Sequence, residues 1–158
     1  MLLVEKRALK HLETMNVVAR CITASLGLSH KIRRDVLCGV AFGKHSVVWF
    51  RGDVIKQWRP DANSTLGLLR KILNGRRHPG VWIGGLEEAE KLLPDAKKLL
   101  FRFVHNAREM PNIKPPYIAY VGMSDVASEV RYSLTIDFPE KLYPDQAIAI
   151  ANIISDRG

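Results

Sequence analysis

The sequence predicts an α+β protein with an N-terminal helical pair, a β-hairpin, and a mainly antiparallel sheet packed by helices. Apolar residues recur at helical spacing over residues 3–26, which indicates an amphipathic helix. Apolar and polar residues alternate over residues 129–138, which is typical of a strand with one face in water. The chain has 158 residues, of which 47% are hydrophobic, so it can form one domain over residues 1–158. A sub-boundary is expected near residues 75–80.

The helical pair is expected over residues 3–26 and from Ser29 to about Ala41. Gly27 suits the C-terminal cap of the first helix, and Ser29 suits the N-cap of the second. The inner side of the first helix is predicted to consist of its apolar residues, Val4, Ala8, Leu12, Met15, Val18, Ala19, Ile22 and Leu26. Cys21 and Cys38 lie within these apolar patterns, which favours buried thiols over a disulfide.

Residues 46–59 are predicted to form a hairpin that turns at Gly52 and Asp53. One face would carry Val48, Phe50 and Ile55 and belong to the core. The other would carry Val47, Trp49, Arg51, Lys56 and Trp58. This second face could stack bases and neutralise phosphates, or each tryptophan could be partly buried under arginine and lysine stems.

The rest of the chain is expected to alternate between helices and strands. In order, the sequence predicts a helix over 65–74, a loop over 76–80, a short strand over 81–83, a helix opening at Leu86, strands over 117–122 and 129–138, and a closing helix from Pro144. The loop between the last two strands is short, so they are expected to be antiparallel neighbours.

Residues 96–107 fit two patterns. Leu99, Phe101 and Phe103 alternate as in a strand, whereas a larger set of apolar residues falls on one helical face. The larger set favours a helix.

The charge of the chain bears on its partners. Lys and Arg number 24 against 16 acidic residues, which gives a net charge of +8. Such a charge favours polyanionic partners such as nucleic acid or an acidic protein, although a basic protein need not have one. The sequence shows no secretory signal and no segment long enough to span a bilayer, so a cytoplasmic protein without a membrane partner is expected.

Residues 22–36 resemble the helix-turn-helix segment of bacterial DNA-binding proteins. Gly27 lies where that turn requires it, and Arg33 and Arg34 follow on the second helix. The resemblance implies that these arginines contact DNA and that the hairpin serves as a wing. Ile32 lies one residue early and the first helix is longer than usual, so a plain helical hairpin remains the alternative.

The residue patterns do not favour an enzyme. The sequence lacks a Gly-x-Ser-x-Gly motif, a phosphate-binding loop and a metal-helix histidine pair, so we predict no catalytic residue, metal or cofactor. His45, His78 and His105 lie in or near basic polar segments and could cleave RNA without a metal, a small nuclease or hydrolase activity that ranks last.

The function predicted from sequence is therefore nucleic-acid binding, mainly through phosphates. The predicted contact residues are Arg33, Arg34, Trp49, Arg51, Lys56 and Trp58. The alternative is a protein-interaction or accessory module from a mobile element or virus, which could be a homodimer. DNA and RNA are not distinguished at this level.

Overall fold

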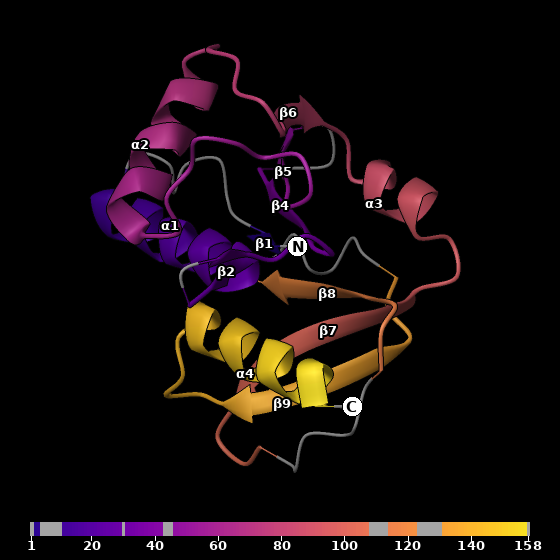
Figure 1. The fold of residues 1–158 in the computed structure, drawn as a ribbon. Helices are drawn as coiled ribbons and strands as arrows, with labels where there is room; N and C mark the ends of the chain where they lie inside the picture. The colour runs from indigo at the N-terminus through magenta and orange to yellow at the C-terminus, as the bar shows by residue number, and fades with distance from the viewer. Residues whose placement is uncertain are drawn as a thin grey trace.

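The computed structural model describes residues 2–3, 11–29, 31–42, 46–107, 114–122 and 131–157, which form an α+β fold (Figure 1). Seven strands make one sheet in the order β6-β5-β4-β1-β8-β7-β9. These are β1 (Leu2–Leu3), β4 (Leu37–Ala41), β5 (Val47–Arg51), β6 (Val81–Gly84), β7 (Lys97–Val104), β8 (Tyr117–Gly122) and β9 (Leu134–Pro139). The short β2 (Gly27–Leu28) and β3 (Lys31–Ile32) pair separately. The helices are α1 (Leu12–Leu26), α2 (Ala62–Leu73), α3 (Glu87–Leu92) and α4 (Pro144–Arg157).

The sheet is mixed, and its α+β class is as predicted. β5 is antiparallel to both β4 and β6, whereas β1 is parallel to both β4 and β8, and β7 is parallel to both β8 and β9. Parallel pairs therefore outnumber antiparallel pairs in this sheet, unlike the antiparallel majority that we expected. The predicted neighbours β8 and β9 are separated by β7, because each of them pairs with one edge of that strand.

Helices cover the sheet on both faces. α1, α2 and α4 pack together on one face, where the core includes Ile22, Leu69 and Ala147 (Figure 1). On the other face, Ala89 of α3 belongs to a second cluster with Trp49 and strand residues of β4, β5 and β8. The strands between these layers are buried on both sides, so most of their side chains are apolar.

The predicted hairpin over residues 46–59 is wrong. The strand over 47–51 pairs instead with Leu37–Ala41, with Leu37 opposite Arg51 and Ala41 opposite Val47. Gly52 is not a hairpin turn residue, since its amide donates to the carbonyl of Val36 at 3.0 Å and an added Cβ would clash with the carbonyl oxygen of Arg33. Beyond it, residues 52–60 form a loop.

The predicted second helix, from Ser29 to Ala41, is also wrong. The chain over 27–32 is a small antiparallel pair, and Leu37–Ala41 is a central strand. The resemblance to a helix-turn-helix therefore fails, because the described residues after the turn form strands where a recognition helix would lie. The first helix begins at Leu12, while Leu2–Leu3 is a strand; the stretch 4–10 of the prediction lies outside the described residues.

Residues 97–104 form strand β7 and not the expected helix. Leu99 and Phe101 face the α1, α2 and α4 layer, while Leu100 faces the α3 layer. Three consecutive buried apolar residues are typical of a strand covered on both faces, but periodicity alone does not distinguish such a run from a buried helix segment. The alternation of Leu99, Phe101 and Phe103 matches the strand, since all three pack in the same core layer.

Several other predicted elements are confirmed. α2, β6, α3, β8 and α4 lie at or within a few residues of their expected positions. β9 covers the second half of its predicted range and ends one residue beyond it. Cys21 and Cys38 are free and buried, and burial raises the pKa of both thiols. Within the described ranges, no helix is both long enough and apolar enough to cross a membrane.

Gly39 on β4 provides a test of this packing. A Cβ at this position would lie 2.7 Å from Cε3 of Trp49, so Gly39→Ala should lower the free energy of unfolding by about 1–3 kcal/mol through overpacking. Gly67→Ala, in α2 with nothing within 4 Å of the added carbon, should instead stabilise by about 0.5–1 kcal/mol. Urea unfolding measures both, and an unchanged Gly39→Ala midpoint would contradict the packing.

Candidate nucleic-acid interface and ligand cavity

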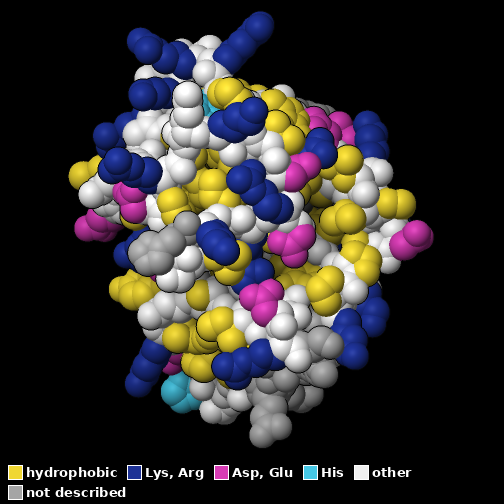
Figure 2. Space-filling model, in the orientation of Figure 1, with side chains coloured by type: hydrophobic (Ala, Val, Ile, Leu, Met, Phe, Trp, Pro, Cys, Tyr) yellow, Lys and Arg dark blue, Asp and Glu magenta, His cyan; other side chains and the backbone are white. Residues whose placement is uncertain are grey.

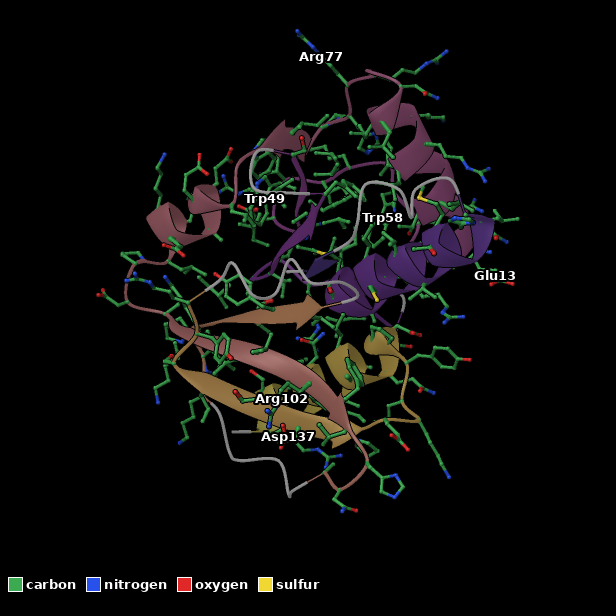
Figure 3. All side chains as sticks on the ribbon, turned by 180° about the vertical axis from the view of Figure 1, so that it is seen from behind. Glu13, Trp49, Trp58, Arg77, Arg102 and Asp137 are labelled. Atoms are coloured by element: carbon green, nitrogen blue, oxygen red, sulfur yellow. The ribbon has the colours of Figure 1, made fainter. Side chains whose placement is uncertain are left out.

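The predicted aromatic and basic face is not assembled, because both of its tryptophans are buried. Trp49 is 1% exposed, its indole nitrogen donates to the carbonyl of Gly85 at 3.2 Å, and its ring stacks on Trp82 with centroids 6.4 Å apart. Figure 3 shows its side chain directed inward from β5. Central strands have neighbours on both faces, so the expected solvent face of β5 is a second core face.

Trp58 is 7% exposed and lies in the core between α1 and α2. Its indole nitrogen donates to the hydroxyl of Thr65 at 3.1 Å, and Thr65 also contacts the hydroxyl of Thr23 at 3.0 Å. Thr65 itself donates to the carbonyl of Asp61 at 2.7 Å. These bonds connect α1, α2 and the preceding loop, so Trp58 is a structural residue. Neither indole can stack on a base in this fold.

The predicted arginines have local partners. Arg33 is 9% exposed, and its guanidinium donates two hydrogen bonds to the carboxylate of Asp156, one of them at 2.8 Å. This bidentate pair lowers the pKa of Asp156 and raises the pKa of Arg33. Arg34 donates to the carbonyl of Gly52 at 3.1 Å, and Arg51 pairs with Asp53 at 2.8 Å.

Arg34, Arg51 and Lys56 are exposed, so their contact with nucleic acid stays a prediction. Lys56 forms no ion pair within the described ranges. Its carbonyl oxygen lies 2.8 Å from Nε2 of His78, and this hydrogen bond ties the 52–60 loop to the loop after α2.

Cationic side chains gather at the C-terminal end of α2. We call Arg70, Lys71, Arg76 and Arg77 the α2-end cluster; all four are exposed, and none forms an ion pair in the described part of the chain. Between Asp61 and Glu87 the sequence has no acidic residue. Figure 2 shows Lys and Arg side chains projecting from this end of the molecule, and Figure 3 shows Arg77 directed into solvent.

The α2-end cluster has a clear structural origin. Asn74 and Gly75, with φ of +81° at the glycine, end the helix and turn the chain, so Arg76 and Arg77 lie beyond the last turn. Arg70 and Lys71 also interact favourably with the negative end of the helix dipole. That role does not apply to the arginines of the loop.

In the sequence the α2-end cluster is visible only as two short basic runs. The feature that distinguishes these runs from the other basic runs is the absence of acidic residues around them.

A cavity of about 300 Å³ opens between β4 and β8. Its walls are mostly apolar and come from both helical layers, for example Cys21 of α1 and Ala89 of α3. Arg33, Asp35, Ser155 and Asp156 line its outer end. No local sequence pattern predicts this cavity, because it lies between strands that are distant in the sequence.

The histidines of the nuclease hypothesis have separate partners. His78 bonds to the 52–60 loop, whereas His105, at the end of β7, lies 2.9 Å from Glu140. His45 lies outside the described residues. Among the residues that are described, no group of three His, Cys, Asp or Glu side chains could hold a metal ion.

Comparison with known proteins gives two kinds of similarity, although no protein-family model matches the chain. A tRNA (pseudouridine(54)-N(1))-methyltransferase of Haloarcula marismortui is 39% identical over 62 residues, which covers 39% of this chain and 31% of that protein. The protein of the same description from Methanocella arvoryzae is 33% identical over 81 residues, covering 44% of this chain and 42% of the relative. The match thus spans less than half the length of either relative.

The second similarity is in the fold. The crystal structure of Archaeoglobus fulgidus Nep1 bound to S-adenosylhomocysteine superposes with a TM-score of 0.64, covering 90% of this chain and 69% of that chain. The sequence identity is 16%, so this likeness establishes a shared fold and nothing finer. Mixed sheets of this kind host many functions, and function has to be argued from the site and the sequence matches.

Proposed function

We propose that this chain binds RNA and methylates a pseudouridine of tRNA, with S-adenosylmethionine as the methyl donor. The observation that carries the proposal is the sequence match to proteins described as tRNA (pseudouridine(54)-N(1))-methyltransferases, 39% identical over 62 residues in one of them. The fold shared with Nep1 bound to S-adenosylhomocysteine supports it, since that molecule is what S-adenosylmethionine becomes after giving up its methyl group. This proposal narrows the predicted nucleic-acid partner to RNA. A protein partner and a homodimer stay predictions.

The RNA-binding surface that we propose is the α2-end cluster. Four exposed cations without ion-pair partners in the described ranges can approach phosphates without first breaking a salt bridge. Arg33, by contrast, would have to leave the carboxylate of Asp156. Phosphate contacts of this kind give affinity that falls with salt concentration and little sequence preference. Selection of a particular tRNA position would need further contacts.

The cavity between β4 and β8 does not fit the methyl donor. It lies at the amino ends of these parallel strands, whereas ligands of open α/β sheets bind outside the carboxyl ends. Its volume is at the lower limit of small-molecule pockets, about 300–1,000 Å³. Two of its polar groups, Arg33 and Asp156, bind each other. The Nε atom of Arg33 is buried and has no hydrogen-bond acceptor in the described part of the chain. The residues that line this cavity are therefore not the ones that we expect to hold the donor.

Removing the α2-end cluster should weaken RNA binding. In the variant with Arg70, Lys71, Arg76 and Arg77 all changed to Gln, the dissociation constant for a tRNA transcript should rise. The slope of log K against log salt should become shallower by roughly 0.7–0.9 for each phosphate that these side chains neutralise in the unaltered protein. Fluorescence anisotropy over a series of salt concentrations measures both quantities.

The matched control changes four exposed cations elsewhere, Lys91, Lys97, Lys141 and Arg157, to Gln. Both variants carry four fewer positive charges, which takes the net charge from +8 to +4. A general effect of net charge would weaken binding equally in the two variants, and that result would place the RNA elsewhere.

Methyl transfer itself is the direct test of the proposed reaction. With S-adenosylmethionine labelled on its methyl group, the chain should transfer label to a tRNA that contains pseudouridine and not to the same tRNA carrying uridine at those positions. Mass spectrometry of the nucleosides identifies the methylated base. Binding of RNA without any transfer, at chain concentrations above the dissociation constant, would leave an RNA-binding protein and remove the catalytic part of the proposal.

A further inference from the structure

Gln57 has an unusual backbone conformation for its residue type. Its φ is +54°, and within the described ranges it is the only residue other than glycine with a positive φ. A side chain makes this conformation unfavourable, so glycine is the usual residue there. Gln57 is exposed, and its side chain forms no hydrogen bond with another described residue. No contact of the side chain within the described fold therefore compensates for the strain.

The fold itself requires a turn at this point. Ile55 is 1% exposed and Trp58 is 7% exposed, and the two residues between them are exposed. Ile55 is held further by Gly80, where an added Cβ would lie 2.5 Å from the amide nitrogen of Ile55. Burial of these anchors explains the turn, but glycine would make the same turn with less strain. It does not explain why a glutamine occupies the position.

The turn is attached to the loop that follows α2. Nε2 of His78 lies 2.8 Å from the carbonyl oxygen of Lys56, which belongs to the peptide group between Lys56 and Gln57. His78 directly follows Arg76 and Arg77 of the α2-end cluster, in the loop that leads from α2 to β6 (Figure 1). This hydrogen bond therefore holds Gln57 beside the two loop arginines of that cluster.

The chemistry of Gln57 differs from that of its surroundings. Lys56, Arg76 and Arg77 carry positive charges, which attract phosphates whatever the RNA sequence. The amide of glutamine has no charge, and it offers both a hydrogen-bond donor and an acceptor. That combination suits the edge of a nucleobase, adenine in particular, whose N6 donates while its N7 accepts. In RNA such edges are accessible at unpaired bases.

We propose that Gln57 is a specificity-determining residue that hydrogen-bonds to the edge of an unpaired base, with adenine preferred, in RNA bound to the α2-end cluster. This inference rests on the RNA-binding part of the proposed function and not on methyl transfer. The cations of the cluster supply affinity. The turn supplies orientation, because the His78 hydrogen bond and the buried Ile55 and Trp58 fix the backbone from which the amide projects. The strained conformation is retained because recognition needs an amide at this position.

Gln57→Gly separates the contribution of this residue to stability from its contribution to recognition. Because glycine relieves the strain, the melting temperature should rise by about 2–4 °C. Because the amide is lost, the dissociation constant for a tRNA transcript should rise by about tenfold. The slope of log K against log salt should not change, since a neutral side chain releases no counterions from RNA. Calorimetry measures the first quantity, and fluorescence anisotropy over a salt series measures the other two.

Base preference is measured by sequencing the RNA that the protein selects from a random pool. The unaltered chain should enrich adenine at one position, and Gln57→Gly should not. The matched control is Gln146→Ala, which removes the other glutamine of the sequence, an exposed residue of α4. It should leave both the dissociation constant and the base preference unchanged.

The possible failures are distinguishable. If Gln57→Gly leaves affinity and base preference as they are in the unaltered chain, the base contact is refuted and the RNA-binding proposal stands. Gln57→Gly with a lowered melting temperature and weaker binding at every sequence would also refute the contact, because Gln57 would then be a structural residue. If the unaltered chain binds no tRNA, the proposed function fails and the base contact fails with it.

Discussion

Burial of the central strands on both faces is the constraint on which the rest of this structure depends. β4 and β5 lie between α1 and α2 on one side and α3 on the other, so consecutive residues such as Val48, Trp49 and Phe50 all enter a core. Gly39 faces the ring of Trp49 across the β4–β5 pair and leaves the space that the indole fills. The same burial moves polar recognition away from the middle of the sheet and toward its ends and loops.

The basic side chains fall into two groups, those paired with acids and those without an acidic partner in the described residues. Three arginines are matched with acids: Arg33 with Asp156, Arg20 with Asp145, and Arg102 with Asp137 on neighbouring strands β7 and β9 (Figure 3). The α2-end cluster has no such acids nearby in the sequence, and its positive charge is left for a partner. A net charge of +8 alone would not distinguish these two arrangements.

Elements governed by local signals could be predicted from the sequence. α2 has an N-cap, an apolar face and a closing glycine, and it lies close to its predicted position. Its cap is Asp61, whose carboxylate accepts from the amide of Ser64 at 2.8 Å. α4 likewise begins at Pro144, a residue suited to a first helical turn. Helices and strands are both visible in the sequence patterns, and together they predict the α+β class.

Elements governed by tertiary contacts could not be predicted in this way. Residues 37–41 and 97–104 are buried on both faces, and a continuous apolar run fits a helix and a doubly covered strand equally well. The two faces of residues 47–51 are divided as the alternation predicts, but the face with Val47 and Trp49 is buried in the α3 layer and does not face solvent. The cavity depends on strands that are about eighty residues apart in sequence, which no local pattern reports.

The central claim is that this fold encloses Trp49 and Trp58 and leaves RNA recognition to exposed cations. The most direct measurement is iodide quenching of tryptophan fluorescence in the Trp82→Phe variant, whose emission comes from the two enclosed indoles alone. We predict little quenching and no change in it when tRNA is added. Strong quenching that tRNA relieves would contradict the account, because it would place an indole on the RNA-binding surface.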